Sequence, residues 1–371
     1  MLLRMNVTRP AMVLMLACGA LLRAQLEDSD KATQAKCTDY LKTPLPAEAL
    51  TVSAPKAWPT CDSMKSYSGI GRKVDFETAR KCAWSERLAQ QSGLEPRYTE
   101  ESVFGGSAML TVLYANGEGV PRNIPLAIRF ACEAGGAPAE IAIRVGHLES
   151  LGTTAAKSGP AFDFCDDITS GFMEGFCAAY GSEIEDQKRA ASLDALTALF
   201  TPAQGTAFKT LRRFEKEYAR AHAKGEIDLS GSARAMYQID AEGTLRDDFF
   251  AAIEQFEIGK YPGGSKAQYA DADVRLNLIY RKTLSDAEAH KNDYGAIQPE
   301  GIREAERAWL KYRDAWVAFA KLRYPAVPAE AWLALLTDDR TSILDGSFCD
   351  MDAVDGPCAQ KGDTWKPSPL P

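Results

Sequence analysis

Histidine is scarce in this chain, and the sequence motifs that build catalytic centres are missing. Only three histidines occur among 371 residues, and they lie far apart at His147, His222 and His290. There is no Gly-x-Ser-x-Gly elbow, no P-loop, no His-Glu-x-x-His and no Cys-x-x-Cys. These absences argue against the common hydrolase, nucleotide-binding and zinc sites. We therefore expect no enzyme activity, no catalytic residue, no cofactor and no metal.

Long hydrophobic runs are also missing, except at the N-terminus. Arg4 and Arg9 precede the apolar run Ala11–Leu22, and Ala24 offers a small residue just beyond it. A basic N-terminal region, a short apolar run and a small residue at the cleavage site are typical of a secretory signal peptide. The run is too short to span a membrane, which takes about 20 residues. We predict that residues 1–24 are a signal peptide and that the mature protein is periplasmic or secreted, with no transmembrane segment.

The cysteines support export. Cleavage near Ala24 removes Cys18 and leaves an even number of cysteines, which in an exported chain predicts disulfides. The candidates are Cys37, Cys61, Cys82, Cys132, Cys165, Cys177, Cys349 and Cys358. Their spacing leaves the connectivity open, although Cys165 with Cys177 and Cys349 with Cys358 are plausible local pairs. A lipoprotein anchored at Cys18 is the alternative, because "MLAC" followed by glycine loosely resembles a lipobox.

Basic residues are in the minority. The chain has 43 lysines and arginines against 51 acidic residues, and removal of residues 1–24 takes away three more arginines. A surplus of negative charge argues against binding to nucleic acid or to anionic lipid. It is compatible with a basic protein partner, and solubility is the simpler explanation.

The N-terminal half contains a weakly patterned segment and then an internal repeat. Residues 25–60 are predicted to form an extended arm held by Cys37 and Cys61. Within residues 61–160, two glycines and an alanine recur at a spacing of 48 residues. The matching positions are Gly69 and Gly117, Gly71 and Gly119, and Ala79 and Ala127. Each copy is predicted to be a helix end, a glycine turn and a second helix with a small residue in its packed face.

The second copy resembles the Sel-one-like repeat, a helical hairpin related to the tetratricopeptide repeat. The matching residues are Leu110, Leu113, Tyr114, Gly117, Gly119, Val120 and Ala127. The resemblance implies a concave interaction surface, which about two copies would provide only over a short length. Residues 161–192 are predicted to form a disulfide-linked connector.

The C-terminal half is patterned as helices, so the predicted fold is mostly α, with helical-hairpin repeats followed by a helical bundle. The bundle is predicted to cover residues 193–345, followed by a tail with a cysteine pair at 346–371. A helix predicted from about Pro299 to Arg323 carries apolar residues spaced alternately by three and four. These are Ile302, Ala305, Trp309, Tyr312, Trp316 and Phe319. Such a stripe is typical of a helix that packs along a seam.

Polar residues lie beside this stripe and on two other predicted helices. They are Asp273, Asn277 and Tyr280 around Leu276; Glu306, Arg313 and Asp314; and Thr337 with Arg340. Buried polar groups must be paired, so we predict a shared network that fixes helix register. A recognition surface that includes Arg313 or Asp314 is the alternative. A catalytic pair is disfavoured, because arginine cannot act as a general base at neutral pH.

These same residues resemble the lysozyme inhibitor LprI-like domain over about Gln268–Leu344. The motif reads Asp273, Leu276, Asn277 and Tyr280; then Glu306, Arg307, Trp309, Arg313 and Asp314; then Leu336, Thr337 and Arg340. The resemblance implies a helical domain that binds and inhibits lysozyme. The chain departs from the family in having Glu306 where glutamine is frequent, and in having no cysteine between Cys177 and Cys349 to tie the helices.

Three functions follow as hypotheses. The first is an exported, non-enzymatic binding protein of the bacterial cell envelope, with lysozyme as the implied partner; opposite net charges would speed their encounter. The second is an envelope scaffold that binds another protein through the repeats. The third, a minor alternative, is an enzyme that acts on peptidoglycan.

Overall fold

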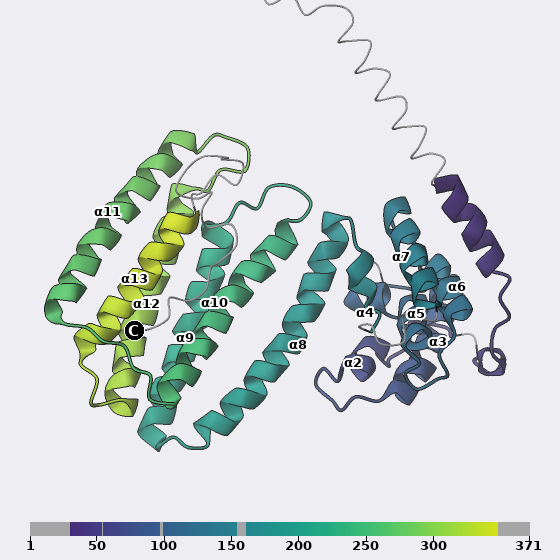
Figure 1. The fold of residues 1–371 in the computed structure, drawn as a ribbon, viewed down its shortest axis with the longest axis horizontal. Coiled ribbons are helices and arrows are strands. Elements are labelled where there is room, and N and C mark those ends of the chain that lie inside the picture. The colour runs from purple at the N-terminus through teal and green to yellow at the C-terminus, as the bar shows by residue number, and fades with distance from the viewer. Residues whose placement is uncertain (1–29, 54, 97–98, 154–160, 348–371) are drawn as a thin grey trace, which may run out of the picture. The chain divides into compact units, whose positions relative to one another are not determined.

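The computed structural model describes residues 30–347, except for 54, 97–98 and 154–160. Over these residues the chain is helical without any strand, which confirms the mostly-α prediction. The predicted signal peptide, Cys18, and the tail with Cys349 and Cys358 lie outside the described residues. The chain divides into two compact units, Met1–Phe176 and Cys177–Pro371, and each is described by itself (Figure 1).

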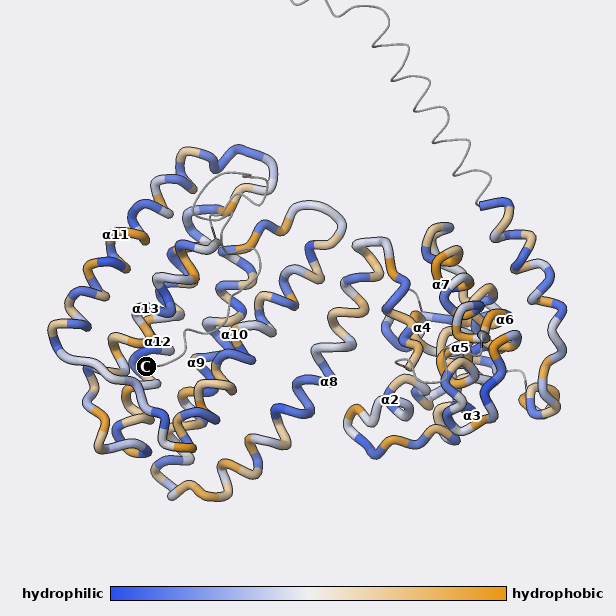
Figure 2. Tube along the Cα trace, viewed as in Figure 1, coloured by the Kyte–Doolittle hydropathy of each residue, from blue (hydrophilic) through white to orange (hydrophobic). Residues whose placement is uncertain are grey.

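The N-terminal unit is built around one fully buried helix. Its elements are a helix at 30–40, η1 (Ala47–Leu50), α2 (Ser63–Ser68), α3 (Phe76–Gln91), α4 (Glu100–Phe104), α5 (Ser107–Asn116), α6 (Ile124–Ala134), α7 (Pro138–Leu151) and η3 (Phe164–Asp167). In α5, residues from Ser107 to Ala115 are all buried. Figure 2 shows hydrophobic colouring concentrated on α5 and α6, as expected for the centre of a small helical unit.

The internal repeat has the same turn geometry in both copies. Asp75 caps α3 and Asn123 caps α6, and both residues have φ −148° and ψ 91°. The glycine that ends the preceding helix is left-handed in both copies, with φ 77° at Gly69 and 76° at Gly117. An alanine there would meet the left-handed strain that glycine avoids. The sequence echo therefore corresponds to two helix–turn–helix hairpins, α2 with α3 and α5 with α6.

The segment predicted as an extended arm differs from that prediction, because residues 30–40 are helical. Two disulfides hold this part of the unit: Cys37 pairs with Cys132, and Cys61 pairs with Cys82. Cys165 and Cys177 are disulfide-bonded as well. Disulfides in the described residues fit an oxidising compartment such as the periplasm or the extracellular medium.

The C-terminal unit is a bundle of long helices. Its elements are most of α8 (Gly171–Thr197), α9 (Pro202–Gly225), α10 (Arg234–Glu257), α11 (Lys266–His290), α12 (Pro299–Arg323) and α13 (Ala329–Ser347). Helix α8 runs through the predicted boundary at 192, so the predicted connector is largely part of a continuous helix. The closest packing is of α12 on α9, of α11 on α13 and of α10 on α9.

The predicted apolar stripe of α12 forms the centre of this bundle. The helix has the predicted bounds, and Ile302, Ala305, Trp309, Trp316 and Phe319 are buried. One core cluster gathers aromatic rings from four helices around Trp316, namely α9, α10, α12 with its C-cap residue, and α13. Its largest members are Phe208, Phe249, Phe256, Trp316, Phe319, Tyr324 and Trp332. Because aromatic rings bury a large area, this cluster supplies much of the hydrophobic stabilisation of the unit.

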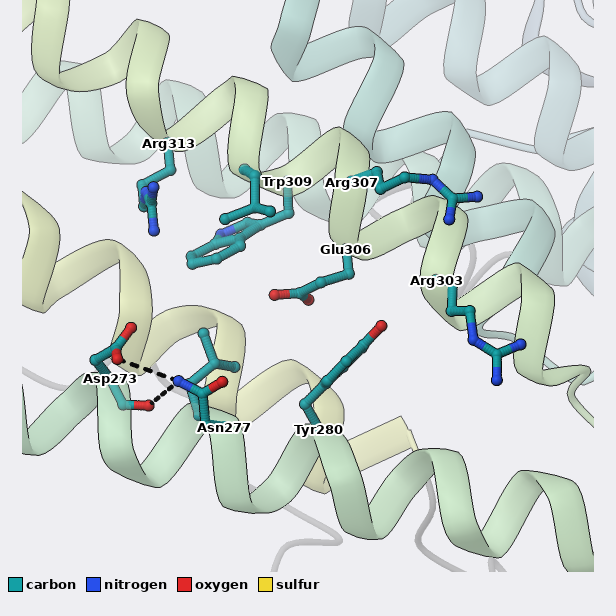
Figure 3. A pocket seen from close by; sticks show the side chains of 10 residues that line it. Asp273, Asn277, Tyr280, Arg303, Glu306, Arg307, Trp309 and Arg313 are labelled. Carbon is teal, nitrogen blue, oxygen red and sulfur yellow. Dashed lines mark hydrogen bonds between the residues drawn. The ribbon is translucent and has the colours of Figure 1, made fainter.

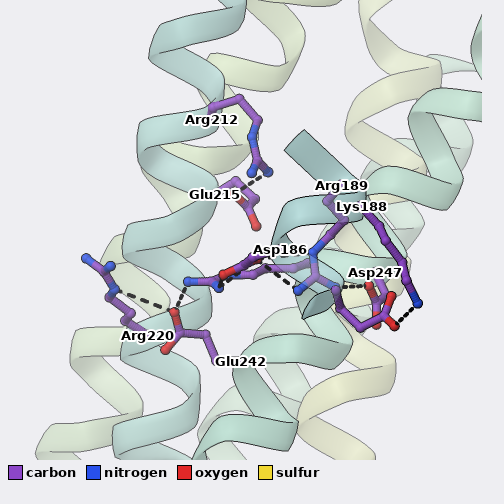
Figure 4. Close-up of polar contacts among 10 residues, drawn as sticks. Asp186, Lys188, Arg189, Arg212, Glu215, Arg220, Glu242 and Asp247 are labelled. Carbon is purple, nitrogen blue, oxygen red and sulfur yellow. Dashed lines mark hydrogen bonds and ion pairs between the residues drawn. The ribbon is translucent and has the colours of Figure 1, made fainter. Parts of the chain in front are cut away.

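Ion pairs link α8 to α10 (Figure 4). Asp186 on α8 pairs with Arg246 on α10 at 3.0 Å, and Arg189 on α8 pairs with Asp247. Glu242 contacts both Arg246 and Arg220 of α9. The carboxylates Asp186 and Asp247 are at least half exposed, so these pairs set the orientation of α8 more than they add to stability.

Asp248 lies next to this cluster, and its buried carboxyl group should make the C-terminal unit more stable at acidic pH than at neutral pH. Burial, helped by the Asp247 carboxylate, raises the pKa of Asp248 from 3.8 to about 7. The unfolded chain therefore ionises this group first, and the folded state loses stability as pH rises from about 4 to about 7. Asp248→Asn should leave the Tm unchanged near pH 4 and raise it near pH 8 by about 2–4 °C. A gain of the same size at both pH values would contradict this assignment. Asp271→Asn, at an exposed position on α11, is the control and should move the Tm little at either pH.

Candidate functional site

A half-open groove of about 380 Å³ lies between α11 and α12 in the C-terminal unit. In Figure 3, Asp273, Asn277 and Tyr280 rise from α11 toward α12, and Glu306 and Trp309 point back from α12. The lining residues are Asp273, Leu276, Asn277, Tyr280, Arg303, Glu306, Arg307, Trp309, Leu310 and Arg313. Most of them were singled out by the sequence pattern, so the structure brings the first two parts of the motif to one place.

The groove exists because α11 leans on α13 and makes few contacts with α12. On α11 the groove residues Asp273, Asn277 and Tyr280 are spaced by four and three, which places them on one face. The start of α11 is fixed by a reciprocal capping box, in which Ser265 and Gln268 bond to each other's backbone N–H. Pro299 begins α12, where its missing N–H costs nothing.

A buried ionic network lies behind the groove, centred on Arg340 of α13. The Arg340 side chain is fully buried and donates two hydrogen bonds to Glu226, at 2.8 and 2.6 Å. Its Nε donates to Glu306 at 2.9 Å, and a third contact reaches the Tyr218 hydroxyl at 3.3 Å. His222 Nδ1 lies 2.8 Å from Glu226 Oε2, the oxygen that also accepts from Arg340 Nη1. The network joins α9, α12 and α13, and Glu306 connects it to the groove.

The two carboxylates that share Arg340 respond differently to it. Burial raises the pKa of both, but the charge and two hydrogen bonds of Arg340, together with His222, hold the pKa of Glu226 below its ordinary value. Glu306 has one hydrogen bond from Arg340, and burial keeps its pKa above the ordinary value. Glu226 is therefore the firmly ionised partner of the pair. Glu306, at the groove wall, is the carboxyl that can take up a proton more readily.

In the described part of the chain, the arginines of the groove form ion pairs with exposed acidic side chains. Arg313 lies 5.3 Å from the Trp309 ring centre and contacts Asp314 at 2.8 Å. Arg307 contacts Glu300 at 2.7 Å, and Arg303 contacts the same carboxylate at 3.5 Å. Both Glu300 and Asp314 are at least 60% exposed. Such pairs contribute little and exchange readily with other carboxylates.

The single shared network predicted from the sequence is therefore two separate features. Arg340 and Glu306 form the buried network, whereas Asp314 is exposed and the side-chain amide of Asn277 donates to Asp273 of its own helix, at 2.7 Å to the carbonyl and 3.1 Å to the carboxylate. Thr337 is buried, but its hydroxyl has no hydrogen-bond partner among the described residues. The prediction that it joins the network was wrong.

Three network residues were missed in the sequence, namely Tyr218, His222 and Glu226. Tyr218 and His222 continue the apolar face of α9 at helical spacing, and all three are buried. Polar side chains at consecutive positions of an apolar face are the signal that could have found them.

The repeat-turn candidates lie in the N-terminal unit, away from this groove in sequence. Tyr114 and Ala127 are buried, and Gly117 and Gly119 both have positive φ. Within the described residues, one group of metal-ligand types comes together, at Cys61, Cys82 and Glu86. The two sulfurs are joined in a disulfide and so offer no thiolate. No helix in the described part of the chain has the length and apolar character needed to cross a membrane.

Comparison with known proteins supports the resemblance of the C-terminal unit. Residues 265–344 match the family model described as "Lysozyme inhibitor LprI". The matched segment covers α11, α12 and most of α13, and so contains every residue that lines the groove. No curated protein and no solved structure matched the chain.

Proposed function

We propose that this is an exported, non-enzymatic protein of the bacterial cell envelope that binds lysozyme and inhibits it. The groove between α11 and α12 is proposed as the contact surface. The observation that carries the proposal is the coincidence of the family match with this groove: the matched residues gather their polar side chains on an open surface. Arg340 and Glu306 then serve to hold the groove wall in place.

The chemistry of the groove suits a partner that presents carboxylates. Lysozyme cleaves its substrate with a pair of carboxyl groups in an open cleft. Arg303, Arg307 and Arg313 line the groove, and a guanidinium binds carboxylates in a planar, two-pronged geometry. Their present partners, Glu300 and Asp314, are exposed, so a partner's carboxylates can replace them at small cost.

The long-range attraction to a basic partner must come from outside the matched segment. Residues 265–344 contain twelve basic and twelve acidic side chains, whereas the whole chain has a net charge of −8. The remaining parts of the chain would therefore speed the encounter, and the groove would form the specific contact. Salt is expected to slow association more than it weakens the bound complex.

Clearing of a peptidoglycan suspension by lysozyme tests the proposal. The protein from residue 25 onward should slow clearing at micromolar excess and should not clear the suspension by itself. Arg307→Ala with Arg313→Ala should weaken inhibition about tenfold or more, since two charged contacts are lost. The matched control is Arg275→Ala, which removes an arginine of α11 that pairs with Asp338 outside the groove. Unchanged lysozyme turnover with the native protein would refute the function, and equal effects of both variants would refute the groove.

A further inference from the structure

The N-terminal unit holds one of its own glutamates in a polar site between two helices. Glu48 Oε1 accepts hydrogen bonds from the Trp84 indole at 3.1 Å and from the Tyr114 hydroxyl at 2.9 Å. Its second oxygen lies 3.1 Å from Arg80 Nε. Arg80 and Trp84 come from α3, and Tyr114 comes from α5. Two hydrogen-bond donors and one guanidinium charge thus converge on a single carboxylate.

The rings of this site are fixed by the core of the unit. Trp84 and Tyr114 are 2% and 4% exposed, and both pack against Phe130, with ring centres 5.4 and 5.7 Å apart. The two rings are therefore packed against α6, in contacts that do not involve the segment that carries Glu48. A preformed set of donors is what a binding site for a carboxylate requires.

The segment that carries Glu48 is attached by polar and covalent contacts rather than by apolar burial. No residue of η1 is buried, and Leu50 is 83% exposed. The attachments include the Cys37–Cys132 and Cys61–Cys82 disulfides on either side of Glu48, the Lys36–Glu149 ion pair at 2.7 Å and a hydrogen bond from Arg129 to the Thr43 carbonyl. Polar contacts of this kind exchange with water at little net cost.

Two disulfides keep this segment beside the site, Cys37–Cys132 before Glu48 and Cys61–Cys82 after it. Glu48 follows Cys37 by eleven residues, and a tether of this length gives an effective concentration on the order of millimolar. A free ligand must outcompete that concentration to enter. The segment is thus positioned as a tethered competitor for any other carboxylate that binds Arg80, Trp84 and Tyr114.

We infer that Arg80, Trp84 and Tyr114 form a recognition site for a glutamate presented by a segment of another protein, and that Glu48 occupies this site in competition. The site lies in the N-terminal unit and does not depend on the proposed inhibition of lysozyme. It gives the repeat hairpins a defined partner chemistry, namely an acidic peptide segment.

A peptide copied from the chain itself is the probe. Two fluorescein-labelled peptides would be made, one with the sequence of residues 43–52 and one with Glu48→Gln. The protein from residue 25 onward would be prepared as the native chain and as a released variant with Cys37→Ser, Cys132→Ser and Glu48→Ala. Every copy of the variant lacks Glu48. A segment of one copy therefore cannot place a glutamate in the site of another copy and compete with the peptide.

The released variant should bind the glutamate peptide about tenfold more tightly than the glutamine peptide, as measured by fluorescence anisotropy. Adding Tyr114→Phe should remove most of this preference, since that hydroxyl donates to Glu48. The native protein should bind neither peptide. Glu48→Ala with both cysteines kept is a second variant that preserves the tether, and it should show the same preference with weaker binding. Equal binding of both peptides to these variants, or no binding by either, would show that Glu48 only anchors the arm and would overturn the proposal.

Discussion

Arg340→Ala should lower the free energy of unfolding of the C-terminal unit by about 3–5 kcal/mol at neutral pH. The substitution leaves Glu226 fully buried without the Arg340 cation and removes the hydrogen bond that Glu306 accepts from Arg340 Nε. Removing one partner of a buried pair costs far more than the pair contributes, because a bare charge remains in a low-dielectric site. Urea titration followed by tryptophan fluorescence would measure the loss, since Trp309, Trp316 and Trp332 all lie in this unit.

The pH dependence of this loss distinguishes an uncompensated charge from a simple cavity. In the native protein the pKa of Glu226 is depressed, so its contribution to stability is present above the unfolded pKa and disappears as pH falls through the folded pKa. Without Arg340, protonation of Glu226 relieves the cost, and the gap between variant and native protein should narrow from pH 7 to pH 5. Adding Glu226→Gln should recover part of the stability at pH 7. A gap that stays constant with pH would mean that lost packing dominates. The exposed pair is the control: Arg275→Ala should cost less than about 1 kcal/mol.

The network also shows what sequence patterns can and cannot reveal. Helical spacing placed Glu306 and Arg340 beside an apolar seam, because that information is local to each helix. Glu226 lies just after the last residue of α9. A carboxylate at such a position is ordinarily expected to be a solvated loop residue. Glu226 reaches Arg340 across 114 positions of sequence, through the crossing of α9 with α12 and α13. No local period encodes that partnership.

The same contrast holds for the larger elements. The helix at Pro299–Arg323 was predicted with the observed bounds, because its apolar stripe and its starting proline are strong local signals. The glycines that recur at a spacing of 48 residues have positive φ at the turns of both hairpins, which is a local requirement that the sequence displays. The arm was predicted as extended because residues 30–40 show no apolar period, yet they are helical and held by the Cys37–Cys132 disulfide. The disulfide holds this helix against the unit without an apolar face, so the sequence of the helix shows no period from which it could be predicted.

Gly301→Ala should destabilise the C-terminal unit by about 2–3 kcal/mol, although alanine is the better helix former. Gly301 of α12 faces Gly225, the last residue of α9, where the two helix backbones touch. A Cβ at 301 would lie 2.5 Å from the Gly225 carbonyl oxygen and 2.8 Å from its Cα. Backbone lines the contact, so no side chain can rotate away, and the helices must separate. The separation would also disturb Ile302, which is fully buried next to the crossing.

Gly243→Ala is the matched control, because its effect should have the opposite sign. Gly243 lies inside α10, and a Cβ there would have no atom within 4 Å. With no clash to offset it, the propensity of alanine should raise stability by about 0.5–1 kcal/mol. Thermal unfolding of the two variants beside the native protein measures both effects in one experiment. If Gly301→Ala were also stabilising, the close approach of α9 and α12 would be wrong, and with it the crossing that brings Glu226 to Arg340.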